Sequence, residues 1–288
     1  MVTRLSMERF ELLGRWQETE EFRKVAGLKS AWATSEGHVI GGVYFMVEHD
    51  VFVYTLLTKD NAGRYRRFFT STPKLSAREA ESSINSDLGI IESDEKPAPA
   101  LEAAPGGVDL FAAGLATKYN PKYVNLRDSA NTSAKREVMT EIARWFDDLD
   151  GNFVKDFQTT GFDARVWELY LFTSFNELGF TIDNSNPVPG FRLSRGGQKV
   201  FVEAVTANPS DGKQFDIAGG PPPPPEDFAY YIEHAMPQKF GSPLRSKVKK
   251  EYWKGEDIGA HPFVLALADF HAPASMTWSQ TALSFYLY

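Results

Sequence analysis

Apolar positions along the first third of the chain predict a small α+β region. Residues 5–27 carry one partly apolar helical face. The stretch 38–58 is rich in valine, tyrosine and phenylalanine and is interrupted near residue 49, which predicts a hairpin of two strands. Ser76 followed by Glu79 is a capping-box pattern that begins a helix. We therefore expect an N-terminal α+β accessory domain over residues 1–91.

A polar segment separates this region from the rest of the chain. Residues 92–109 are rich in proline, alanine and glutamate and have no apolar period, so we expect a linker or loop region over 92–132. Apolar residues at steps of three and four then predict an amphipathic helix over 133–149. The remaining chain, 133–288, is expected to form an α/β domain.

The pattern from residue 162 to 271 predicts the core of that domain. It indicates a buried helix, three strands, two helices and a last strand, at 162–180, 180–183, 191–195, 199–207, 227–236, 242–254 and 261–271. Ser242 is the expected N-cap of the second of these two helices, with Pro243 at its first position. The last run is continuously apolar, which is typical of a central, covered strand. The expected fold class is α/β, with a central mixed sheet flanked by helices and a core of Phe180, Leu193, Phe201, Val202, Phe263, Leu265 and Leu267.

Composition narrows the functional classes. The chain has 288 residues, of which 42% are hydrophobic and 24% charged, as in ordinary globular proteins. Its net charge of −7 argues against a globally basic nucleic-acid binder, so any basic surface must be local. The absence of cysteine excludes disulfides, thiolate zinc sites and cysteine nucleophiles.

Targeting signals are missing from the pattern. The N-terminus has no apolar signal-peptide core, and no window holds eighteen apolar residues. We therefore expect a cytoplasmic protein that does not enter a membrane. The last residues, FYLY, look like part of an apolar strand, which leaves open whether the protein is truncated at Tyr288.

Two carboxylates stand in apolar surroundings. Glu168 lies in the middle of the expected buried helix, and Glu203 lies inside the third strand. A carboxylate in such a place is costly unless it is paired, hydrogen-bonded or bound to a cation. Arg165, one turn before Glu168, allows a structural ion pair, and the alternative is a metal-binding or catalytic group. Asp269 and His271 share one side of the last strand, which favours a strand-end hydrogen bond over a metal site or triad fragment.

This order of elements resembles the PD-(D/E)XK superfamily, which has the restriction-endonuclease-like fold. The resemblance covers about residues 160–271. The amino-acid sequences of 157–172 and 199–209 are also similar to those of uncharacterised bacterial proteins of this superfamily. It implies a restriction-endonuclease-like core. In the family, a helix carboxylate, an aspartate that opens the second strand and a Glu-X-Lys pair on the third strand hold Mg²⁺ and cut phosphodiesters.

Carried onto this chain, the resemblance matches Glu168 to the helix carboxylate and Glu203 to the glutamate of Glu-X-Lys. Gly190 stands at the expected aspartate position and Val205 at the expected lysine position. Lys247, beside the buried stripe of a following helix, is then the replacement lysine. Asp183 is a candidate third metal ligand, and the implied cofactor is Mg²⁺, with Mn²⁺ as the alternative.

The sequence leaves two functions open. The first is a metal-dependent nuclease that acts on DNA or RNA, and the second is a catalytically inactive scaffold of the same fold that binds nucleic acid or protein. Arg245, Lys249 and Lys250 are candidate phosphate contacts or, alternatively, a solvated helix face. The five prolines at 221–225 form either a stiff surface loop or a protein contact. A homodimer is also left open.

Overall fold

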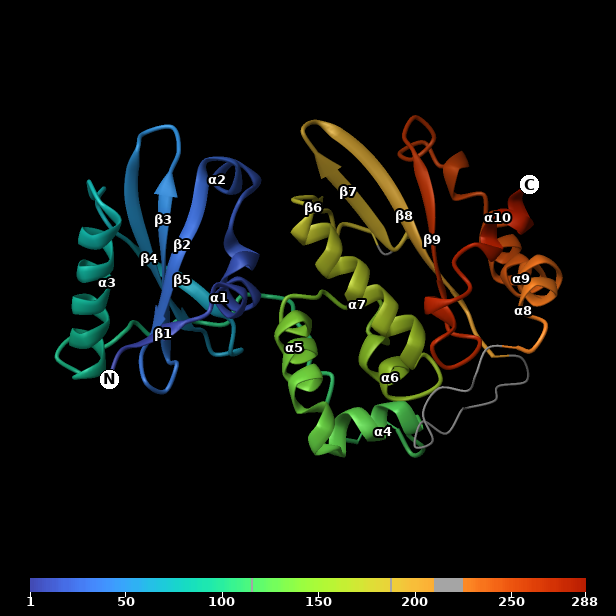
Figure 1. The fold of residues 1–288 in the computed structure, drawn as a ribbon, viewed down its shortest axis with the longest axis horizontal. Helices are drawn as coiled ribbons and strands as arrows, with labels where there is room; N and C mark the ends of the chain where they lie inside the picture. The colour runs from blue at the N-terminus through green and yellow to red at the C-terminus, as the bar shows by residue number, and fades with distance from the viewer. Residues whose placement is uncertain (115, 187, 210–224) are drawn as a thin grey trace. The chain divides into compact units, whose positions relative to one another are not determined.

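The computed structural model describes residues 1–114, 116–186, 188–209 and 225–288 (Figure 1). The chain forms two compact units. Unit 1 comprises residues 1–109 and 137–147, and unit 2 comprises residues 110–136 and 148–288. Of the stretch expected as a linker, 92–109 thus belongs to unit 1 and 110–132 to unit 2. The proline run at 221–225 lies outside the described residues except for Pro225.

Unit 1 is built on an antiparallel five-stranded sheet in the order β1-β2-β3-β4-β5. Its strands are β1 (Thr3–Leu5), β2 (Ala26–Ala33), β3 (Val39–Met46), β4 (Val51–Lys59) and β5 (Tyr65–Thr70). Helix α1 (Met7–Gly14) packs on one face through Phe10 and Leu13, and α3 (Ala77–Glu92) packs on the other through Ile84 and Leu88. The hairpin and the α+β character expected for this region are confirmed.

The helix boundaries of unit 1 differ in part from the expectation. The helix expected over 5–27 is divided into α1, a 3₁₀ turn at Arg15–Gln17 and α2 (Glu20–Val25), and its last residues already belong to β2. Thr19 restarts the helix because its side chain accepts a hydrogen bond from the Phe22 amide at 3.2 Å. The expected cap of α3 is confirmed, with the Ser76 hydroxyl accepting from the Glu79 amide at 3.2 Å.

Unit 2 holds a mixed four-stranded sheet in the order β6-β7-β8-β9. The three strand pairings are antiparallel, antiparallel and parallel in that order. The strands are β6 (Thr181–Ile182), β7 (Phe191–Arg195), β8 (Gln198–Ala207) and β9 (Phe263–Asp269). The helices and turns of unit 2 are α4 (Pro121–Asp128), a 3₁₀ turn (Ala130–Thr132), α6 (Phe153–Gln158), α7 (Phe162–Glu177), α8 (Phe228–Tyr230), a π-helical turn (Tyr231–Ala235), α9 (Met236–Val248), 3₁₀ turns at Tyr252–Lys254 and Ser275–Thr277, and α10 (Ala282–Leu287). Helix α5 (Ser133–Ala143) is divided between the units, with residues 133–136 in unit 2 and 137–143 in unit 1, so the expected domain over 133–288 is not one unit. A mixed sheet flanked by helices, the expected fold class, is confirmed.

Helix α9 begins earlier than its sequence pattern predicts. It starts at Met236, so Pro243 lies inside the helix and not at its first position. Met236, Phe240 and Leu244 recur every four residues and pack in one cluster with Val205 of β8. This continuous apolar stripe extends the helix through a proline that removes one backbone hydrogen bond.

Strand β9 and the last residues also differ from the expectation. β9 is at the end of the strand order of the described residues rather than in the centre, and Val264 is 44% exposed. The FYLY segment lies in helix α10 and its adjoining residue, not in a strand. Within the expected core, Leu193, Phe201 and Val202 are buried, whereas Phe180, Phe263, Leu265 and Leu267 are partly buried. Among the described residues, no helix is long and apolar enough to cross a membrane.

Candidate active site around Glu203 and Lys247

Glu203 lies on β8 at the point where the neighbouring strand begins. The ladder between β7 and β8 stops at the pair Phe191–Val202, so Glu203 is the first residue past it. Its side chain leaves on the same face as Val205, which packs against α9. The Gly190 amide, just before β7, donates to Oε2 of Glu203 at 2.9 Å. The carboxylate therefore lies at the open end of β7, and it is 8% exposed.

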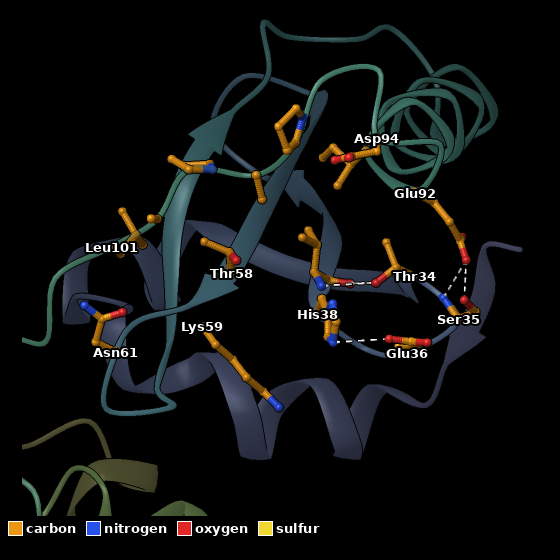
Figure 2. A pocket seen from close by; sticks show the side chains of 16 residues that line it. Thr34, Ser35, Glu36, His38, Thr58, Lys59, Asn61, Glu92, Asp94 and Leu101 are labelled. Carbon is orange, nitrogen blue, oxygen red and sulfur yellow. Dashed lines mark hydrogen bonds and ion pairs between the residues drawn. The ribbon is translucent and has the colours of Figure 1, made fainter.

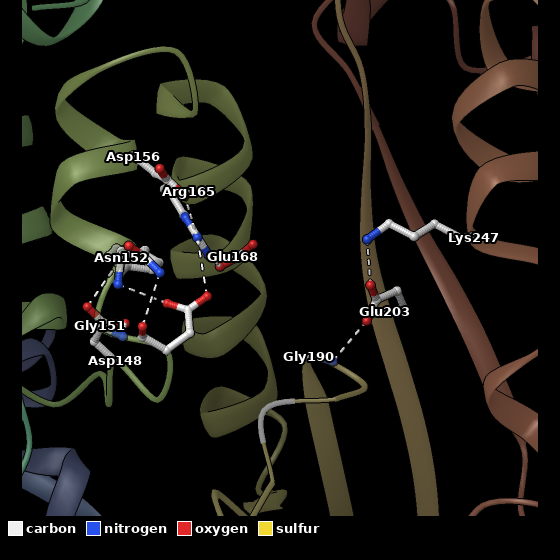
Figure 3. A network of polar contacts seen from close by, with 11 residues as sticks. Asp148, Gly151, Asn152, Asp156, Arg165, Glu168, Gly190, Glu203 and Lys247 are labelled. Carbon is white, nitrogen blue, oxygen red and sulfur yellow. Dashed lines mark hydrogen bonds and ion pairs between the residues drawn. The ribbon is translucent and has the colours of Figure 1, made fainter. Parts of the chain in front are cut away.

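Lys247 of helix α9 contacts the Glu203 carboxylate (Figure 3). Its ammonium Nζ lies 2.5 Å from Oε1 of Glu203. Lys247 is three residues after Leu244, so it follows the buried stripe of α9 by about one turn. Packing of that stripe on β8 brings the ammonium to the strand. The structure thus joins two of the residues that the sequence singled out, although 44 positions separate them.

Glu168 lies on α7 and is held by Arg165. One guanidinium nitrogen of Arg165 donates to Oε2 of Glu168 at 2.8 Å, and the other donates to Asp156 at 2.7 Å. Burial raises the pKa of Glu168 above its ordinary value, Arg165 opposes this rise, and the negative charges of Glu203 and Asp150 add to it. The structural Arg165–Glu168 pair considered from the sequence is therefore present. The pKa of Glu168 is thus affected by the charge of Glu203 as well.

The two glutamates approach from different faces of the sheet. Phe175 of α7 packs on Phe191, with ring centroids 5.2 Å apart, and Phe191 shares its face with its partner Val202. That face is opposite to the one from which Glu203 leaves, because neighbouring residues of a strand alternate. Two ligands of one metal ion would have to project into one pocket, and the different faces of the sheet do not support that arrangement. The negative charge of Glu203 still contributes to the raised pKa of Glu168. Strand β7 does not extend beside Glu203, because its pairing with β8 ends at Val202.

Asp183 is not joined to this group by any contact of the described residues. It is exposed, and its carboxylate accepts from the Ser185 amide at 2.9 Å in a local turn. The backbone amide of Asp183 donates a hydrogen bond to the Arg192 carbonyl of β7. Arg192 in turn pairs with Phe201 of β8, so Asp183 lies two strand positions away from β8. Two strand spacings correspond to roughly 10 Å. Asp183 is therefore placed beside the sheet and not at the carboxylate–lysine pair.

The predicted phosphate contacts lie at the end of α9 and just after it. Arg245 is in the helix, Lys249 caps it and Lys250 follows, and all three side chains are exposed. A hydrogen bond with Tyr252 raises the pKa of Lys250 above its ordinary value, and the charge of Glu203 adds a smaller effect in the same direction. The role of these three residues as phosphate contacts stays a prediction.

Asp269 and His271 form a strand-end hydrogen bond, as the sequence favoured. Nδ1 of His271 lies 2.8 Å from Oδ1 of Asp269, and Ser279 donates to Oδ2 at 2.6 Å. A carboxylate accepts only, so Nδ1 donates to Asp269, and Nε2 lies 3.0 Å from the Tyr231 hydroxyl. Tyr231, 40 positions before His271, and Ser279, 10 positions after Asp269, stand in no sequence pattern that marks them as partners of the strand end.

Unit 1 contains a separate cavity of about 690 Å³ (Figure 2). It lies between residues 91–101 and the ends of β3 and β4, and none of the residues predicted for the site line it. Several of its polar groups pair with one another. Glu92 accepts from the Ser35 amide at 3.1 Å, and His38 lies 3.4 Å from Glu36.

The comparisons add no family to this geometry. Searches against protein-family models, curated proteins and solved structures find no match for the chain. The class that the structure defines is a mixed α/β protein with two open sheets, whose second sheet carries a buried carboxylate–lysine pair.

Proposed function

We propose that unit 2 has a restriction-endonuclease-like core and that the protein is a metal-dependent nuclease acting on phosphodiester bonds of DNA or RNA. The contact of Lys247 with Glu203 carries this proposal. Val205 occupies the position where the family has its lysine, and the proposed site would lack a cation without a replacement. A lysine that reaches the same glutamate from α9 supplies the charge that the strand lacks.

The two glutamates are the proposed ligands for Mg²⁺ or Mn²⁺. Mg²⁺ is commonly held by one or two protein carboxylates while it keeps water and binds substrate phosphate, so two glutamates would be enough in number, although Glu203 and Glu168 approach from different faces of the sheet. When bound, the ion would supply Lewis-acid stabilisation of the charge that develops on the phosphate. With Gly190 in place of an aspartate, we expect weak metal binding before nucleic acid arrives.

The chain's own groups have definite tasks in this proposal. Lys247 holds Glu203 in place and directs an ammonium with further N–H donors toward the bound phosphate or the attacking water. The Gly190 amide fixes the second carboxylate oxygen. Arg165 is the ion-pair partner of the partly buried Glu168. Lys250 would add positive charge for a phosphate contact just after the end of α9.

The alternative is a scaffold of the same fold that binds nucleic acid without cutting it. One observation favours it: both carboxylate oxygens of Glu203 already have donors within the chain, Lys247 and Gly190. In addition, no group of three or more histidines and acidic residues placed to hold a metal exists among the described residues. An inactive descendant of a nuclease would have these properties.

One assay separates the two functions. Purified protein is incubated with end-labelled single-stranded DNA, duplex DNA and RNA in Mg²⁺, in Mn²⁺ and in chelator. We expect cleavage only with metal, loss of cleavage in Glu203→Gln and Lys247→Met, and unchanged cleavage in Lys199→Met. Lys199 is the matched control because it is an exposed lysine on the same strand face as Glu203. Nucleic acid that is bound, seen as slower migration in a native gel, but not cleaved in any condition would favour the scaffold.

A further inference from the structure

Two aromatic side chains on α7 flank Glu168 in the sequence and stack on each other. The rings of Trp167 and Tyr170 have centroids 5.2 Å apart and planes inclined by 11°. Tyr170 is 60% exposed, although a tyrosine ring on a packed helix usually turns into the protein. One side of its ring is therefore covered by Trp167, and much of the rest is open to solvent.

The stack is held rigidly to the sheet. The indole N–H of Trp167 donates to the Ala266 carbonyl of β9 at 2.9 Å. Ala266 pairs with Ala204, which is the residue after Glu203. The stack is thus anchored one residue from Glu168 on the helix and next to the Glu203 position on the sheet. The bond ties Trp167 to the sheet and the Trp167 ring covers one side of Tyr170, so both restrict the positions that the stack can take before a flat ligand binds.

We propose that Trp167 and Tyr170 form a stacking platform for an unpaired nucleobase, so that the substrate of the proposed nuclease is single-stranded nucleic acid. The inference rests on the proposed function for its substrate class. A rigid aromatic face binds any base through stacking, without reading its identity. A base within an intact duplex is already stacked between its neighbours and offers no free face, so a continuous duplex would not use this platform.

The chain also provides a matched control. Tyr230 of α8 is a tyrosine with nearly the same exposure, 61%, and it contacts His234 rather than another large ring. It stands away from Glu168 in the sequence and does not belong to the stack. Replacing either tyrosine with alanine removes a similar exposed ring, so a general effect of surface aromatic loss would be the same in both variants.

The test is an affinity measurement in chelator, which separates binding from cleavage. The probes are a fluorescent thymidine dodecamer, an abasic oligonucleotide of the same length and a blunt duplex. We expect the wild-type protein to bind the thymidine strand most tightly. Tyr170→Ala should weaken this binding about tenfold, which corresponds to one stacked base. Tyr170→Phe and Tyr230→Ala should keep the wild-type affinity, and the abasic strand should bind Tyr170→Ala and wild type equally.

Each outcome decides the proposal. Equal loss in Tyr170→Ala and Tyr230→Ala, no loss in Tyr170→Ala, no preference for bases over abasic strand, or no binding at all would overturn the platform. Base-dependent binding that Tyr170 supports, together with no metal-dependent cleavage, would uphold the platform and reject the nuclease. Cleavage without a Tyr170 effect would uphold the nuclease and reject the platform.

Discussion

Nζ of Lys247 and Oε1 of Glu203 lie 2.5 Å apart, although one belongs to a helix and the other to a strand 44 residues earlier. The pair is largely buried, with 10% of the Glu203 side chain exposed and 28% of Lys247. A buried ion pair adds little net stability, but removing one partner leaves the other charge without compensation. The pair is therefore a sensitive point in unit 2, whatever reaction it serves.

A double-mutant cycle should reveal this coupling. Lys247→Met leaves the Glu203 carboxylate with only the Gly190 amide, and we expect a loss of about 2 kcal/mol in the free energy of unfolding. The double variant Glu203→Gln with Lys247→Met should lose less than the sum of the two single variants, by about 1 kcal/mol or more. Urea unfolding measures all four proteins. Simple additivity would show that the two side chains do not interact in solution.

Glu168 should impose a defined pH dependence. Its pKa in the folded protein is raised, mainly by burial, so its contribution to stability is present at acid pH and is lost as pH rises through the folded pKa. Glu168→Gln has no such group. The unfolding free energy of Glu168→Gln relative to wild type should therefore increase as pH rises through the folded pKa. A difference that stays constant or falls with pH would contradict the environment described for Glu168.

Asp269 should behave in the opposite sense. Its pKa is lowered because hydrogen bonds from His271 and Ser279 overcome the opposing effect of burial. Its stabilising contribution is thus present above the unfolded pKa and is lost as pH falls through the folded pKa. We expect Asp269→Ala to destabilise the protein by about 3 kcal/mol at neutral pH and by less under acid conditions. Thermal unfolding across this pH range checks the trend, with Asp257→Ala, an exposed aspartate, as control.

Arg64 should be structurally important in unit 1. It is 3% exposed, pairs with Asp60 at 3.1 Å and donates to the Pro105 carbonyl at 3.2 Å. Arg64→Met should lower the unfolding free energy by about 3 kcal/mol, because it removes the guanidinium partner of the buried Asp60 carboxylate and the donor to the Pro105 carbonyl. Arg66→Met, on the neighbouring and more exposed position, should change it by less than about 1 kcal/mol. Similar effects in the two variants would show that Arg64 is not buried in solution.

Local patterns predicted the strands and the buried helix around the site, and the family resemblance singled out Lys247 as the replacement lysine. Alternation along 199–207 separated the two faces of β8, and the position of Lys247 one turn after Leu244 indicated that it borders the buried stripe. These features depend on residues close in sequence. The structure confirms that Lys247 reaches Glu203.

The strand pairing and the helices that pack on each face of the sheet could not be predicted in the same way. β9 has the apolar run of a covered strand, yet its place in the strand order follows from its pairing with β8, which is distant in sequence. Alternation also does not show which helix covers which face, so the approach of Glu168 and Glu203 from different sides was missed. Pro243 is inside α9 because packing on β8 outweighs its local preference for a helix start.

The measurement that tests the nuclease proposal most directly restores the missing carboxylate. A side chain on Gly190 would have room, since its first carbon would lie 3.7 Å from the Glu203 carboxylate and 3.9 Å from the Val202 carbonyl, both ordinary contacts. We predict that Gly190→Asp raises the Mg²⁺-dependent cleavage rate of single-stranded DNA by about tenfold or more, as an added metal ligand would, whereas the uncharged control Gly190→Asn does not. Absence of metal-dependent cleavage in the wild-type protein and in a folded Gly190→Asp variant would contradict the nuclease.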